Sequence, residues 1–262
     1  MNLGLPFVQH YADTAGFFTD LASNGPWDCV IIDQNDYGFG SNWNTVNSYL
    51  TGGGRAVVSA WDIDKNLGSP VWATLGAQWS YVFFSPTKPL YAWQSGSPIL
   101  AGIPSPFNPT DTGTSYGRNG HGMNALATAT AVAGWTATPS SGQASIIQRN
   151  DKKTILNSFI VPDFRSHSGA DAVRLWTNEI SSTCGAVTVN LVLKTYKIVN
   201  VLVQVLQGSM VVASRSVTLT YASSTTSILF QVSSGTVKIS GYSIATQTQT
   251  VTPGATLTFY IN

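Results

Sequence analysis

The chain has very few charged side chains. Lys and Arg account for 13 of its 262 residues and Asp and Glu for 12, together 10% of the sequence, whereas about a quarter is usual. Glu179 is the only glutamate. The net charge is +1 and no run of Lys or Arg occurs. The low net charge and the lack of a basic run exclude a protein that binds nucleic acid through a basic surface.

Long apolar runs and cysteines are also scarce. No stretch approaches 18 consecutive apolar residues, so we expect no membrane span. Two cysteines, Cys29 and Cys184, are too few for a disulfide scaffold, and the sequence leaves open whether they bond to each other. The first eight residues show no signal peptide. We therefore expect a mature chain, or one released without a leader as a viral structural protein is on lysis.

Hydroxyl groups replace charge as the main polar chemistry. The chain contains 29 Ser and 29 Thr, and 11% of its residues are aromatic, a share too high for a disordered protein. Cytosolic proteins usually keep soluble with mixed Lys and Glu. We therefore expect an extracellular, cell-surface or virion-surface protein, with a cytosolic enzyme of unusual composition as the alternative.

Composition divides the chain near Gly185. Residues 1–185 hold all eight Trp, all twelve acids and nine of the thirteen bases, which gives a net charge of −3. Residues 186–262 hold four bases and no acid, which gives +4. We predict two domains with this boundary. Their opposite charges favour docking of the domains or contacts between neighbouring copies, so the expected partners are further copies of the chain or other surface or virion proteins.

Residues 1–185 alternate helical and strand patterns. Apolar residues near a spacing of 3.6 predict helices over 10–23, 43–50 and 170–182. Short apolar runs predict strands at 29–32, 56–60 and 81–84, and a late hairpin from 146–147 and 155–161. This alternation predicts a three-layer, flavodoxin-like α/β domain around a mostly parallel sheet.

Residues 186–262 instead alternate apolar and polar residues with a period of two. Val187, Val189, Leu191 and Leu193 show the pattern, which returns four times before the end of the chain. Turn residues separate these runs. Six or seven short strands in 77 residues predict a small antiparallel β-sandwich, and the class is therefore α/β plus all-β.

Five segments of the first domain, in this order, resemble the class I glutamine amidotransferase-like superfamily, in its non-catalytic surface-protein branch. They are PWDCVIID (26–33), YLTGGGRAVVSAWD (49–62), TLGAQWS (74–80), SPILAGIPSPF (97–107) and GADAVRLWTNEI (169–180). The C-terminal GTVKISGYSI (235–244) with TPGATLTF (252–259) is similar to transthyretin-like or carboxypeptidase-regulatory-like β-sandwich modules.

The resemblance implies the fold without the activity. Catalytic members carry a cysteine nucleophile on a tight turn directly after the strand that here ends at Ala60. This chain has Trp61 and Asp62 there, and Gly-x-Cys-x-Gly occurs nowhere. Without a thiolate at this turn the amidotransferase mechanism has no nucleophile.

Polar residues follow the two predicted strands at 29–32 and 56–60. In an open α/β sheet, ligands bind at the carboxyl ends of the strands. Crowded carboxylates there would suit an oxygen-ligated cation such as Ca²⁺, while turn formation and helix capping are the alternative. The predicted binding rim comprises Asp33, Asn35, Asp36, Trp61, Asp62 and Asp64, with Asp33, Asp36, Asp62 and Asp64 as the metal candidates.

His121 and Asp62 are the candidate catalytic residues. His121 lies in a glycine-rich loop (117–122) and would act as a general base near Asp62 or Asp111, or it is a loop histidine without a chemical role. Tryptophans around the rim could stack on a glycan or belong to the core. They are Trp43, Trp61, Trp72, Trp79 and Trp93.

Three functions follow from this pattern. The first is a non-catalytic surface protein used for binding or assembly, because the nucleophile is missing and charge is scarce. The second is an extracellular carbohydrate-active or other hydrolase that uses the rim aspartates and His121. The third is a carbohydrate-binding module. The first needs no cofactor.

Overall fold

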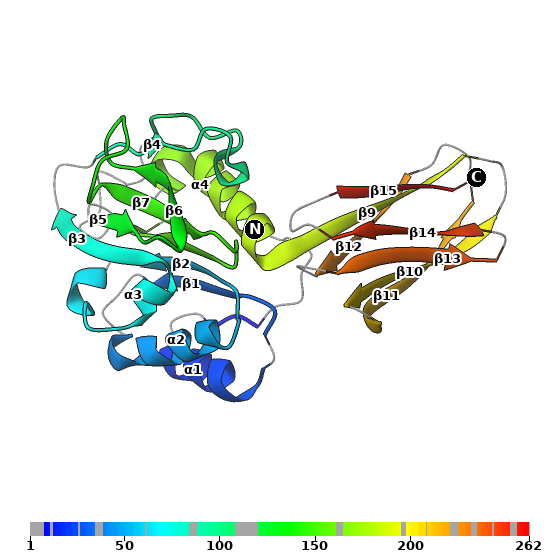
Figure 1. Ribbon diagram of the computed structural model, residues 1–262, viewed down its shortest axis with the longest axis horizontal. Coiled ribbons are helices and arrows are strands. Elements are labelled where there is room, and N and C mark those ends of the chain that lie inside the picture. Colours follow the sequence, from blue (N-terminus) through cyan, green and yellow to red (C-terminus); the bar gives the residue numbers. More distant parts are fainter. Residues whose placement is uncertain are drawn as a thin grey trace. The chain divides into compact units, whose positions relative to one another are not determined.

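The computed structural model divides into two compact units, Met1–Thr183 and Cys184–Asn262, which are described separately (Figure 1). The residues that it describes are 8–10, 13–25, 27–34, 39–60, 62–83, 88–107, 120–160, 165–194, 198–207, 209–220, 225–231, 235–242, 244–251 and 256–261.

The first unit is built around an eight-stranded sheet with the order β1-β2-β8-β7-β5-β3, to which β4 and β6 are attached through β7. Its elements are α1 (Thr14–Ser23), β1 (Val30–Gln34), α2 (Trp43–Thr51), β2 (Ala56–Ala60), α3 (Val71–Thr74), β3 (Ala77–Phe83), β4 (Tyr91–Ala92), β5 (Gly120–Ala125), β6 (Ala129–Gly134), β7 (Ala144–Arg149), β8 (Thr154–Asn157) and α4 (Arg165–Ile180). Short 3-10 turns are η1 (Gly40–Asn42), η2 (Ile63–Lys65) and η3 (Pro98–Leu100).

The prediction of a mostly parallel, flavodoxin-like sheet is wrong. Within the described sheet, β1, β2 and β8 run parallel, whereas β3, β5, β6 and β7 pair antiparallel. Parallel neighbours need a crossover of about a dozen residues, usually a helix. Nine residues separate β6 from β7 and four separate β7 from β8, so these strands can only form hairpins. The sheet is therefore mixed.

Helices lie on both faces of this sheet (Figure 1). Helices α1, α2 and α3 cover one face, where Trp43, Val46 and Leu50 of α2 are buried as the sequence predicts. Helix α4 covers the other face, and its Asn178 side chain donates to the carbonyls of Ile99 and Ala101, both at 3.0 Å. The alternating side chains of the central strands fill both layers.

The second unit consists of two sheets that share one hydrophobic cluster, as in a β-sandwich. One sheet has the order β11-β10-β13-β14 and the other β12-β9-β15. The prediction of a purely antiparallel sandwich is wrong for one pair, because β15 runs parallel to β9. The strands are β9 (Ala186–Leu193), β10 (Val199–Gln207), β11 (Met210–Leu219), β12 (Thr225–Gln231), β13 (Thr236–Gly241), β14 (Ile244–Thr250) and β15 (Thr256–Ile261).

Period-two patterning decides which side chains of this unit point inward. Val189, Leu191 and Leu193 are fully buried on β9, while their polar neighbours face away. Two glutamines of β14 also connect the two sheets. The side-chain amides of Gln247 and Gln249 donate to backbone carbonyls of β15, each at 2.9 Å.

Both cysteines, Cys29 and Cys184, are disulfide-bonded. Cys29 directly precedes β1, and Cys184 lies in the π-helical turn Ser181–Gly185 that follows α4. The sequence had left this pairing open.

Reduction of the disulfide should lower the stability of the protein. A bond between residues so distant in the sequence restricts the unfolded chain, and such bonds contribute about 2–4 kcal/mol. We therefore expect dithiothreitol to lower the Tm in differential scanning fluorimetry. The double variant Cys29→Ser, Cys184→Ser should have the Tm of the reduced protein, and dithiothreitol should not change it. An unchanged Tm after complete reduction would contradict the expectation.

Candidate functional site

Two of the predicted rim residues lie together at the carboxyl ends of the parallel strands. Asp62 follows β2 by two residues and Asp64 lies in η2. Gln34, the last residue of β1, is buried at the same end of the sheet. Asp33 lies on β1 with an exposed side chain. Asn35, Asp36 and Trp61 lie outside the described residues.

Asp62 is a buried carboxyl group, with 1% of its surface exposed. The side-chain amide of Asn66 donates to its Oδ2 at 3.0 Å and to its backbone carbonyl at 3.2 Å. Burial raises the pKa of Asp62 to about 6, while the nearby side-chain amides of Gln34 and Asn66 oppose the shift and the Asp64 carboxylate adds to it. Its Oδ1 and both polar side-chain atoms of Gln34 have no hydrogen-bond partner in the part of the chain that the structure describes.

His121 is fully buried, and it lies in strand β5 rather than in the predicted loop. The indole N–H of Trp79 donates to its Nδ1 at 3.3 Å, so the ring proton of a neutral His121 lies on Nε2. This Nε2 is 4.0 Å from Oδ1 of Asp64, whose Oδ2 pairs with Lys65 at 3.0 Å. The strand position follows from backbone pairing, because the His121 N–H donates to the Ser158 carbonyl.

The arrangement could hold a proton at a buried position. Asp62 and His121 have the residue types of a general acid and a base, yet both are enclosed by the fold. Among the described residues, no three His, Cys, Asp or Glu side chains lie close enough to share a metal ion. The calcium site therefore stays a prediction, which depends in part on Asp36.

The tryptophans near this rim are packed into the unit. Trp43 and Trp72 are buried with their rings 4.8 Å apart. The indole N–H groups of Trp72, Trp79 and Trp93 all bond within the unit, to Asn66, His121 and Thr136. Trp43 and Trp72 therefore belong to the core, one of the two alternatives that the sequence left open, whereas Trp79 and Trp93 are partly buried and pack against it.

A second buried carboxyl group, that of Glu179 in α4, was not among the predicted site residues. It is fully buried, and the side-chain amide of Asn157 donates to its Oε2 at 2.9 Å. Burial raises the pKa of Glu179 to about 8, and the Asn157 hydrogen bond opposes the shift. The sequence carried one signal for it, that Glu179 is the only glutamate of the chain.

Replacing Glu179 with Gln should stabilise the protein at alkaline pH. The folded state raises the pKa of Glu179, so the native protein binds more protons than the unfolded chain between pH 4.5 and 8. Wild-type stability therefore falls as the pH rises through this window. We expect Glu179→Gln to unfold like the wild type at pH 4 and to be about 2–4 kcal/mol more stable at pH 9. Urea unfolding at both pH values measures this.

Glu179→Ala is the matched control, because it removes the carboxyl group but leaves the Asn157 amide without an acceptor and opens a cavity. It should be destabilised at pH 4. A Glu179→Gln variant whose stability matches the wild type at both pH values would show that Glu179 stays ionised in the folded protein.

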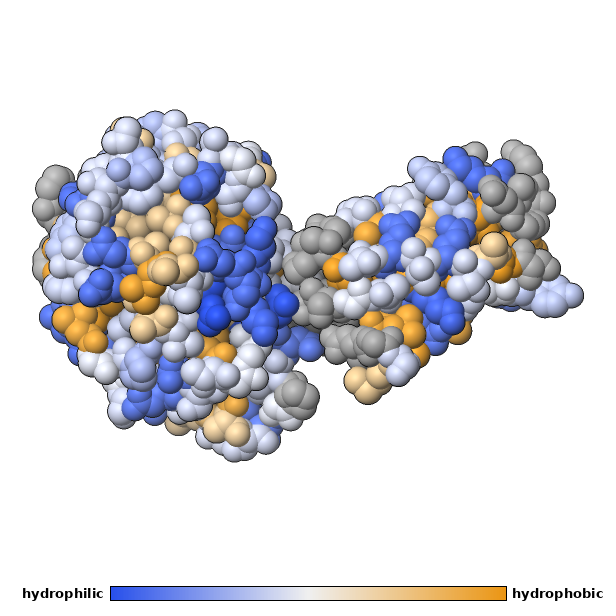
Figure 2. Space-filling model, viewed as in Figure 1, coloured by the Kyte–Doolittle hydropathy of each residue, from blue (hydrophilic) through white to orange (hydrophobic). Residues whose placement is uncertain are grey.

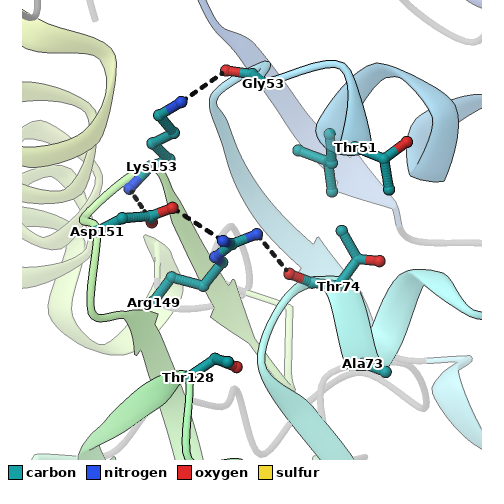
Figure 3. A pocket seen from close by; sticks show the side chains of 9 residues that line it. Thr51, Gly53, Ala73, Thr74, Thr128, Arg149, Asp151 and Lys153 are labelled. Atoms are coloured by element: carbon teal, nitrogen blue, oxygen red, sulfur yellow. Dashed lines mark hydrogen bonds and ion pairs between the residues drawn. The ribbon is translucent and has the colours of Figure 1, made fainter.

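Two cavities lie away from the rim. The first, about 410 Å³, lies near the amino ends of β2 and β8, where Gly53 and Lys153 precede these strands (Figure 3). Its wall consists of Leu50, Thr51, Gly53, Ala73, Thr74, Thr128, Arg149, Asp151 and Lys153. The second, about 350 Å³, shares Arg149 and is lined by Gln94, Gly96, Ser97, Pro98, Thr130, Val132, Gln148, Asn150 and Lys152.

Comparison with known proteins assigns no family. No family model and no curated protein matches the chain. The chain has a weak similarity to the solved structure "Alpha-L-fucosidase isoenzyme 2 from Paenibacillus thiaminolyticus", with 13% identity and a TM-score of 0.41 over 62% of this chain. The chain spans 26% of the length of that fucosidase. Among the helices that the structure describes, none has the length and hydrophobicity needed to cross a membrane.

Proposed function

We propose that this protein is a non-catalytic binding or assembly protein that works outside the cytoplasm, at a cell or virion surface. The observation that carries the proposal is the burial of the two residues best suited to catalysis. Asp62 is 1% exposed and His121 0%. A general acid or base has to reach its substrate directly or through one water.

The cysteines and the surface support the proposed compartment. Disulfides persist in oxidising environments and are rare in the cytosol, and both cysteines of this chain are disulfide-bonded. The visible surface is mostly pale in Figure 2, and the most hydrophilic residues are confined to patches. A pale surface agrees with the 29 Ser and 29 Thr of the chain, whose hydropathy is intermediate.

The second unit offers a surface for assembly at β11. This ten-residue strand is at one end of its sheet and, within the described residues, pairs with β10 alone. Met210 and Val211 at its start are exposed. An unpaired strand edge is a template for another strand, and exposed apolar residues favour association. We propose that copies of the chain associate through β11.

Sedimentation velocity over a range of protein concentrations tests this association. We expect the wild type to sediment faster as its concentration rises, and Val211→Lys to remain monomeric because a charged residue blocks edge-to-edge pairing. Val173→Lys on α4 is the matched control, since Val173 is 49% and Val211 45% exposed. The control should associate like the wild type.

Two results would contradict the proposal. One is a wild type that stays monomeric at every concentration. The other is a Val211→Lys variant that associates as the wild type does, because the contact would then lie elsewhere. Circular dichroism of each variant shows whether the fold is intact.

A hydrolase that uses Asp62 as its acid is the second candidate. Burial raises the pKa of Asp62 to about 6, a value at which a carboxyl group can exchange a proton near neutral pH. Turnover of glycoside or ester substrates that disappears in Asp62→Asn, with the fold intact, would support this function. No turnover by the wild type across such panels would contradict it.

A further inference from the structure

The turn between β7 and β8 concentrates charge in a protein that has little of it. Four of the five residues at 149–153 are charged, while the chain as a whole has 10%. Arg149, Lys152 and Lys153 outnumber Asp151, so the turn has a net charge of +2. The domain around it has a net charge of −3. The turn is therefore a local positive site on a weakly negative domain.

This turn lies between the two cavities described above. Asp151 and Lys153 line the first cavity, Asn150 and Lys152 line the second, and Arg149 lines both. Cationic side chains therefore face both cavities. Each cavity is within the size range of small-ligand sites, about 300–1,000 Å³.

Lys152 adopts a backbone conformation that favours glycine. Its φ is 58°, and it is the one residue other than glycine with a positive φ in the described part of the chain. Glycine adopts this conformation without steric cost, whereas lysine does not. Strained residues of this kind concentrate at functional sites. Lys152 is exposed, and its amine has no partner among the described residues.

Arg149 and Lys153 are held in place by their neighbours (Figure 3). The Arg149 guanidinium donates to the Thr74 carbonyl at 3.1 Å and pairs with Asp151 at 2.9 Å. The Lys153 amine donates to the Gly53 carbonyl at 3.3 Å. These contacts fix two of the three cations at the cavity walls and leave Lys152 able to move toward a ligand.

Hydroxyl and amide groups complete the walls of both cavities. Such groups bond to the hydroxyls of sugars, while lysine and arginine bind carboxylate or sulfate groups. No aromatic residue lines either cavity among the described residues, so the stacking that single-stranded nucleic acid needs is missing here. The hydroxyl and amide side chains are Thr51, Thr74 and Thr128 in the first cavity and Gln94, Ser97, Thr130, Gln148 and Asn150 in the second.

We propose that the β7–β8 turn and its two cavities bind an acidic polysaccharide. Lys152 and Lys153 receive the carboxylate or sulfate groups of neighbouring sugars, Arg149 forms the shared wall, and the hydroxyl and amide side chains bond to sugar hydroxyls. This site does not depend on the assembly role, because β11 belongs to the other unit.

Isothermal titration calorimetry with the full chain at low salt tests the site. The ligands are oligogalacturonate, which carries carboxylates, dextran sulfate, which carries sulfates, and neutral dextran of similar length. We expect at least one acidic ligand to bind and neutral dextran not to bind. Lys152→Gly and Lys152→Gln should each weaken binding about tenfold, the effect of one charge-assisted hydrogen bond. Whichever acidic ligand binds identifies the anionic group.

The variants separate loss of the site from loss of the fold. Lys152→Gly suits the positive φ, so its Tm should equal or exceed that of the wild type. Lys238→Gln removes a lysine from β13 of the second unit and should bind like the wild type. Three results would overturn the proposal: no binding of either acidic glycan, unchanged affinity in both Lys152 variants, or equal affinity for single-stranded DNA.

Discussion

Burial of β2 on both faces is the constraint on which the rest of the first unit depends. All residues of Ala56–Ala60 are 0% exposed, with β1 and β8 paired on either side. Val58 enters the cluster beneath α1, α2 and α3, whereas the Ser59 hydroxyl donates to the Phe159 carbonyl at 2.7 Å. Because both layers continue past the end of β2, Asp62 is buried two residues later, and its pKa rises for that reason.

The few charges of this chain are used in two opposite ways. Glu179 and Asp62 are buried, where desolvation favours their protonated forms. Because only 10% of the residues are charged, a turn with four charged residues in five positions stands out at 149–153. The two proposed surfaces differ in chemistry. Strand β11 offers a strand edge with apolar residues, and the β7–β8 turn offers cations.

Much of the local structure could be predicted from the sequence. The inward side of α2, the β7–β8 hairpin and the buried residues of β9 all follow from periodicity. His121 could not be placed in this way, because the glycines around it suggest a loop. In the structure Gly120 and Gly122 are glycines for a packing reason: a Cβ at either would lie within 3 Å of the ring of Phe83 or Tyr81. Glycines inside a strand can thus mark close packing.

The sequence by itself determined the type of most elements, the scarcity of charge and the change in pattern near Gly185, because these depend on neighbouring residues. Only the tertiary structure decided the direction of β3, β5, β6 and β7, and the burial of Asp62, His121 and Glu179. Strand direction depends on which distant segments pair, and a pKa depends on how much water the surrounding layers exclude. Both are set by contacts across the fold, which no local pattern encodes.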